Sequence, residues 1–348
     1  MYRSLLPALL LASPAFAEVP KVVTDIAPVQ GLVASVMGDL GTPELLIPAG
    51  ASPHSHALKP SEARALQQAD LVFWIGEELS PDLARKIDSI AQNGAAISLF
   101  DLPGTRHLEA RNDVLFAEPG AHDDHDHGEH DDHDEDAHDH DSHDEAAHED
   151  HGHDEHDHDD HDDHDDHGHE AGGHHHEGDD PHAWLSIDNA SAWLTAIAES
   201  LSEQDPENAQ TYAANAEAAQ ARIAEARAAA EATLAPVQDN HFVVFHDAFQ
   251  YYEDSFGLTV LGAISLSDAT APSPARLDAL RDALSGADAA CVFAEPQFDP
   301  RLIAAVTEGA GTPVAELDPL GAKLEPGPGF YPALIEDMAQ RIATCAAQ

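Results

Sequence analysis

Short apolar runs alternate with amphipathic stretches along the first hundred residues of the chain. Runs of strand length lie at 21–24, 44–48, 71–76 and 96–100. Stretches with the hydrophobic period of helices lie between them, at 28–37, 61–69 and 80–93. This alternation predicts a parallel sheet flanked by helices. Residues 50–61 contain a glycine and two prolines, so we expect a loop there, with His54 and His56 beyond the carboxyl end of a strand.

The last third of the chain repeats this pattern. Apolar runs at 241–246, 259–265, 289–296 and 314–318 are predicted strands, and 273–284, 299–308 and 331–343 are predicted helices. The sequence therefore predicts a second parallel sheet with its own helices.

Two helices are expected between these series. Residues 187–202 are amphipathic, and an alanine-rich run extends from Asp205, a capping residue followed by a first-turn proline, to Pro236. About 29 helical residues would be on the order of 43 Å long. The expected fold is α/β: two Rossmann-like lobes, 18–204 and 236–348, joined by a long helix at 205–235, with a cleft between the lobes.

The amino terminus has the pattern of a secretory signal peptide. Arg3 precedes an apolar run from Leu5 to Phe16, and the small residues Ala15 and Ala17 flank Phe16. Residues 1–17 are therefore predicted to be cleaved after Ala17, which would send the mature protein to the periplasm. The apolar run is too short to span a bilayer, for which about 20 residues are needed.

Residues 121–180 break every hydrophobic pattern. This tract holds 20 of the 26 histidines and 28 of the 66 acidic residues, without any lysine or arginine. It has almost nothing apolar to bury, so we predict disorder. Acidity alone would indicate only a solvated segment, but histidine at every second to fourth position indicates metal association. The net charge of −51 excludes nucleic acid and anionic lipid as partners and favours cations.

The chain has two cysteines, Cys291 and Cys345. Two thiols in an exported protein are expected to form a disulfide. They do not form a zinc knuckle, because the sequence has no Cys-x-x-Cys motif.

Six histidines lie outside the tract, and three of them have distinctive settings. His54 is in the proline-flanked loop, His182 follows Asp180-Pro181 before a helix, and His246 ends an apolar strand. Three neutral imidazoles form a normal zinc site, with a carboxylate or water as the fourth ligand. Asp318, at the end of the last strand, is the candidate carboxylate. A lone histidine at a strand end is more often a hydrogen-bonding residue, and spacings of 128 and 64 residues carry no local signature.

Five phrases in the chain resemble those of a known family, in the same order. They are Gly50-Ala-Ser-Pro-His-Ser-His-Ala-Leu-Lys-Pro-Ser61, Asp180-Pro-His-Ala-Trp-Leu-Ser186, Phe245-His-Asp-Ala-Phe-Gln-Tyr-Tyr-Glu-Asp-Ser-Phe-Gly257, Phe293-Ala-Glu-Pro-Gln297 and Leu317-Asp-Pro-Leu-Gly321. The family is the ZnuA-type zinc-uptake substrate-binding proteins of ABC transporters. The resemblance implies two α/β lobes joined by a long rigid helix, a metal site in the cleft and a His/Asp-rich loop. It also implies that His54, His182 and His246 bind zinc.

The fourth ligand is left open by the resemblance. Some relatives have a glutamate before the first histidine, where this chain has Pro53. Asp318 matches an aspartate that completes the site in many relatives, whereas others use water or a loop residue. Glu295 is expected to support the site rather than bind the ion. Manganese-binding relatives typically have a glutamate at the position of His246, so the resemblance favours zinc.

The resemblance implies capture and delivery of Zn²⁺. The chain contains no phosphate-binding loop and no spanning segment, so a membrane permease and an ATPase are expected as separate partners of a monomeric binding protein. A periplasmic zinc buffer without a transporter is the alternative. A zinc hydrolase is disfavoured, because the sequence has no His-Glu-x-x-His motif and no evident general base.

Overall fold

The computed structural model describes residues 19–111, 113, 115–116, 178–265, 273–286 and 289–348. The predicted signal peptide and residues 121–177 of the His/Asp tract lie outside these ranges. None of the helices in the described part of the chain combines the length and hydrophobicity needed to cross a membrane.

The first lobe is built on a parallel sheet of four strands, in the order β2-β1-β3-β4. The strands are β1 (Val22–Thr24), β2 (Glu44–Leu45), β3 (Leu71–Trp74) and β4 (Ala95–Ser98). The helices between them are α1 (Ala27–Met37), α2 (Pro60–Gln68) and α3 (Pro81–Ile90). Every residue of β1 and β3 is buried, as expected for central strands covered on both faces.

The second lobe has a parallel sheet of the same size, in the order β6-β5-β7-β8. Its strands are β5 (His241–His246), β6 (Thr259–Ser265), β7 (Ala289–Ala294) and β8 (Val314–Glu316). Its helices are α6 (Gln250–Phe256), α7 (Pro274–Gly286) and α8 (Pro300–Thr307). The sequence pattern did not predict α6, because its seven residues are too few to reveal a period. Gly257 ends α6 in the left-handed conformation, with φ of 62°.

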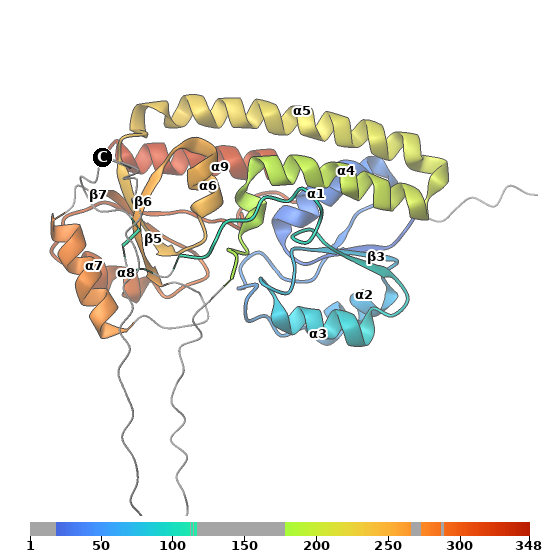
Figure 1. Ribbon diagram of the computed structural model, residues 1–348, viewed down its shortest axis with the longest axis horizontal. Coiled ribbons are helices and arrows are strands. Elements are labelled where there is room, and N and C mark those ends of the chain that lie inside the picture. The colour runs from blue at the N-terminus through green and yellow to red at the C-terminus, as the bar shows by residue number, and fades with distance from the viewer. Residues whose placement is uncertain (1–18, 112, 114, 117–177, 266–272, 287–288) are drawn as a thin grey trace, which may run out of the picture. The chain divides into compact units, whose positions relative to one another are not determined.

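Three helices pack along one another over the two sheets: α4 (Ile187–Gln204), α5 (Ala209–Leu234) and α9 (Phe330–Ala346). The long helix α5 contacts both α4 and α9 (Figure 1). Its buried positions are mostly alanines, which let the neighbouring helices approach closely. The helix begins at Ala209 instead of Asp205, because Pro206–Asn208 form a 3₁₀ turn. The predicted fold class, two parallel α/β lobes with one long helix, is confirmed.

Buried aromatic residues join segments that are distant in sequence. Trp184 and Tyr331 are both almost completely buried. The Tyr331 hydroxyl donates to the Trp184 carbonyl at 2.6 Å, and the Trp184 indole N–H donates to the Pro319 carbonyl at 2.9 Å. These bonds satisfy polar atoms that would be costly to bury alone, and they tie the segment after His182 to the second lobe.

The segment that follows β4 lies along the second lobe. The Leu108 N–H donates to the Tyr251 hydroxyl at 3.0 Å, and the Phe116 N–H donates to the Leu261 carbonyl at 2.7 Å. Leu115 forms an antiparallel bridge with Gly262 at the free edge of β6. The chain is therefore attached to the second sheet directly before it enters the His/Asp tract.

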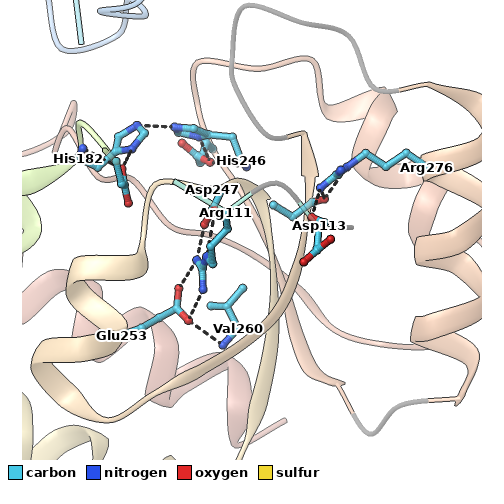
Figure 2. Close-up of polar contacts among 11 residues, drawn as sticks. Arg111, Asp113, His182, His246, Asp247, Glu253, Val260 and Arg276 are labelled. Carbon is cyan, nitrogen blue, oxygen red and sulfur yellow. Dashed lines mark hydrogen bonds and ion pairs between the residues drawn. The ribbon is translucent and has the colours of Figure 1, made fainter. Parts of the chain in front are cut away.

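Arg111 connects the segment after β4 to α6 and to the residue that follows β5 (Figure 2). Its Nε donates to Asp247 at 3.0 Å, and its Nη1 and Nη2 donate to the two Glu253 oxygens at 3.1 and 2.7 Å. The guanidinium also lies 3.9 Å from the centre of the Phe116 ring. Burial alone would lower the pKa of Arg111, but the bonds to Asp247 and Glu253 outweigh it and raise the pKa.

Replacing Arg111 by alanine is expected to lower the free energy of unfolding by about 3–5 kcal/mol, because it leaves two buried carboxylates without their cation. Arg227, which pairs with exposed Asp188 and Glu231, provides the matched control. Arg227→Ala is expected to cost less than about 1 kcal/mol. Urea unfolding of both variants measures the difference, and equal losses would contradict the role of Arg111.

Cys291 on β7 and Cys345 on α9 form a disulfide, with their Cα atoms 5.9 Å apart. The bond closes a loop over a sequence separation of 54 residues and fixes the last helix to a central strand of the second sheet.

Removing the disulfide through Cys291→Ala and Cys345→Ala together is expected to lower the free energy of unfolding by about 4 kcal/mol, mainly because the unfolded chain gains freedom. Urea unfolding measures the loss. The wild-type protein with its disulfide reduced should show a similar loss. Unfolding curves that do not change in either case would contradict this expectation.

Candidate metal centre

His54 lies in the turn-rich loop between β2 and α2. The Ser80 hydroxyl donates to the Pro53 carbonyl at 2.8 Å, so the start of α3 holds the residue before the histidine. The His54 N–H donates to the Ser52 hydroxyl at 3.2 Å. The loop is therefore fixed directly before the His54 ring, which is half-buried.

His182 and His246 come from more deeply buried positions. His182 precedes a short 3₁₀ helix, Ala183–Leu185, and its backbone N–H donates to Asp180 Oδ1 at 3.0 Å. His246 is the last residue of β5, and its backbone N–H donates to Glu295 Oε1 at 3.2 Å. Glu295 follows β7, the neighbour of β5, so two adjacent parallel strands deliver their end residues to the same edge.

The three rings converge on one point. Nε2 of His182 lies 3.3 Å from Nε2 of His54 and 3.3 Å from Nε2 of His246. One nitrogen from each ring falls within 4.8 Å of the others. Nitrogens bound to one tetrahedral zinc ion at about 2.0–2.1 Å would lie roughly 3.3–3.4 Å apart. The spacing of the rings therefore suits a shared zinc ion.

Two buried carboxylates set the orientation of two of the rings. Nδ1 of His182 lies 2.6 Å from Asp180 Oδ1, and Nδ1 of His246 lies 2.7 Å from Glu295 Oε1. When ionised, each carboxylate can only accept, so the facing Nδ1 then carries the proton. Each Nε2 then presents a lone pair toward the other rings, as metal-binding histidines require. Figure 2 shows the facing rings of His182 and His246.

Burial shifts the protonation of these groups. It lowers the pKa of His182 well below its ordinary value, and the nearby His246 adds to this effect. It raises the pKa of Asp180 to about 7 and also raises that of Glu295. His182 is therefore kept in the neutral form that binds metal. A cation bound at the Nε2 atoms of the rings would favour the ionised forms of Asp180 and Glu295.

A small cavity of about 10 Å³ lies at the three rings. That is close to the space that a single water molecule needs. Its walls are partly apolar, from Pro53, Trp184, Phe298, Pro319 and Leu320. Phe298 packs against His246 and Trp184 against His182, with ring centres 5.3 and 5.2 Å apart. These aromatic contacts restrict the orientations of the His182 and His246 rings.

Asp318 does not join the three histidines among the residues that the structure describes. Its Oδ1 accepts from the Leu320 N–H and from Gln297, both at 3.0 Å, and its Oδ2 accepts from the Ala322 N–H at 2.6 Å. Its carboxylate is therefore engaged at the turn after β8. Its role as the fourth ligand stays a prediction.

His56 has a different partner from His54. Its Nε2 lies 3.0 Å from Glu62 Oε2, which also accepts from the Lys59 N–H at 2.7 Å. His56 therefore supports the start of α2 in this structure.

Sequence reasoning missed one of the two partners that orient the rings. It named Asp180 only as a neighbour of His182, and the signal that could have identified it is the two-residue spacing in Asp180-Pro181-His182, which lets the carboxylate reach the ring. The expected supporting role of Glu295 agrees with its contact to His246. Nothing in the local pattern indicated Arg111, because its partners lie 136 and 142 residues away.

Comparisons with known proteins point to one family. Residues 22–345 match the sequence model of the ZnuA family, described as zinc-uptake complex component A, periplasmic. The chain is 49% identical to the high-affinity zinc uptake system protein ZnuA of Paracoccus denitrificans, over 96% of this chain and 94% of that protein. It is 40% identical to the protein of the same name from Brucella abortus, over 93% and 91% of the two chains.

A solved crystal structure of ZnuA has the same fold. It superposes with a TM-score of 0.68 at 22% identity and covers 94% of this chain and 99% of that one. The family match over residues 22–345 and the converging histidines lead to the same conclusion. This chain belongs to the ZnuA family of periplasmic zinc-uptake components.

Proposed function

We propose that this protein captures Zn²⁺ in the periplasm and delivers it to an ABC-type zinc importer. The observation that carries the proposal is the convergence of three Nε2 atoms from segments 128 and 64 residues apart, with separations that fit tetrahedral zinc. His54, His182 and His246 are the proposed zinc ligands. The names of the relatives, high-affinity zinc uptake proteins, support the same cargo.

The donor set favours zinc over manganese. Imidazole nitrogen suits zinc, whereas manganese prefers carboxylate, carbonyl and water oxygen. His246 supplies nitrogen at the position where an oxygen donor would favour manganese. Asp180 and Glu295 stay one hydrogen bond away from the proposed ion and offset its charge through the rings.

The family and the sequence also support proposals about the partners and the location. We propose that residues 1–17 direct export, that a separate permease and ATPase receive the zinc, and that the protein acts as a monomer. The lobes are proposed at 18–204 and 236–348, with 205–235 as the connecting helix. The protein binds and releases its ion and is not proposed to catalyse a reaction.

The His/Asp tract at 121–180 is proposed to gather zinc near the tight site. Its many imidazoles and carboxylates offer weak, interchangeable ligands, which raise the local zinc concentration without fixing one geometry. Tight binding would then belong to the three histidines alone.

Zinc titration against a competing chelator tests this division. Changing His54, His182 and His246 together to alanine should abolish tight zinc binding. The loss of zinc affinity should exceed the 10–100-fold, roughly, that is expected for a residue that only contacts a ligand. A version lacking residues 121–177, which retains Asp180, should keep the tight site and lose only weak binding. If the deletion removes tight binding, or the triple variant retains it, the proposal is wrong.

Asp180→Ala should lower zinc affinity by about 10–100-fold, because Nδ1 of His182 loses the acceptor that fixes the ring. The adjacent Asp179 is a matched control, since it is exposed and contacts His107. Asp179→Ala should bind zinc like the wild type. The same competition titration compares the two, with thermal unfolding as a check on folding. Equal affinities would argue against the positioning role of Asp180.

A further inference from the structure

Gln297 lines the same small cavity as the three histidines. It lies two residues beyond Glu295, just after β7. Its Nε2 donates to the Ala49 carbonyl at 3.2 Å and to Asp318 Oδ1 at 3.0 Å. Ala49 precedes the loop that carries His54, so this one side chain links that loop to the second lobe.

The amide orientation of Gln297 is determined by these partners. Both the Ala49 carbonyl and the Asp318 carboxylate accept hydrogen bonds, so the nitrogen must face them. The Gln297 Oε1 atom is buried, and among the described residues no donor reaches it. A buried carbonyl oxygen without a donor is unfavourable, and a water molecule or ion commonly explains such an atom.

The chemistry of the site supplies the missing donor. Three histidines leave one position on a tetrahedral zinc ion, and water commonly occupies it. Both oxygens of Asp318 already accept hydrogen bonds. On the basis of the proposed zinc binding, we propose that Gln297 Oε1 accepts a hydrogen bond from the water molecule that completes the zinc coordination. Gln297 is thus a positioning residue for the fourth ligand.

The side chain proposed to contact the zinc-bound water is an amide and not a carboxylate. A carboxylate beside zinc-bound water could take its proton and generate a nucleophile, as in metal-dependent hydrolases. The amide oxygen of Gln297 accepts a hydrogen bond but does not act as a base at neutral pH. The amide therefore holds the water in place without providing an adjacent base to take its proton.

Gln297→Leu, which keeps the approximate volume and removes the amide, tests the proposal. Zinc affinity should fall about tenfold, the lower end of the range for an outer partner. The visible absorption bands of the Co²⁺-loaded protein should also change, because the held water is disturbed. Thermal unfolding of the variant measures what the loss of the Nε2 bonds to Ala49 and Asp318 costs the fold. Gln238→Leu is the matched control, since Gln238 donates to the Phe256 carbonyl away from the site, and it should behave like the wild type.

Further variants distinguish a failure of this inference from a failure of the proposed function. Asp318→Asn should keep the absorption bands of the Co²⁺-loaded protein. Loss of these bands would assign the fourth metal ligand to Asp318 and overturn the inference. Wild-type affinity and bands in Gln297→Leu would also overturn it, while His246→Ala should still abolish tight binding. A crystal structure of the zinc-loaded wild type should show a zinc-bound water within hydrogen-bond distance of Gln297 Oε1. If His246→Ala binds zinc tightly, the proposed function itself fails.

Discussion

The orientation of buried imidazole rings is the constraint on which this site depends. A histidine offers a metal only one lone pair, and the proton on its other nitrogen needs an acceptor. Asp180 and Glu295 provide that acceptor to His182 and His246 at 2.6 and 2.7 Å. With the Nδ1 protons held outward, the Nε2 atoms approach one another to 3.3 Å around a shared centre.

The surrounding fold serves this arrangement. The parallel strands β5 and β7 bring His246 and Glu295 to one sheet edge, and the bonds of Trp184 to Pro319 and Tyr331 hold the turn after His182. Because α5 packs on both α4 and α9, the helical layers of the two lobes share one support. The site is thus assembled from both lobes without any local sequence motif.

Charge is distributed unevenly between the surface and the site. The chain has a net charge of −51, yet the atoms that meet at the centre are imidazole nitrogens. The nearby carboxylates each have a defined partner: a histidine for Asp180 and Glu295, and Arg111 for Asp247 and Glu253. Negative charge therefore lies one hydrogen bond beyond the donors, where it can offset a bound dication without occupying its coordination sphere.

Hydrophobic periodicity in the sequence determined the two parallel sheets, the long helix and the position of His246 at a strand end, because each depends on neighbouring residues. It missed α6, which is too short to show a period, and placed the start of the long helix at Asp205 where a 3₁₀ turn forms. The proposed ligand set came from the family resemblance. Only tertiary packing decided the ring separations and the partners of Asp318, since these depend on contacts between segments far apart in the chain.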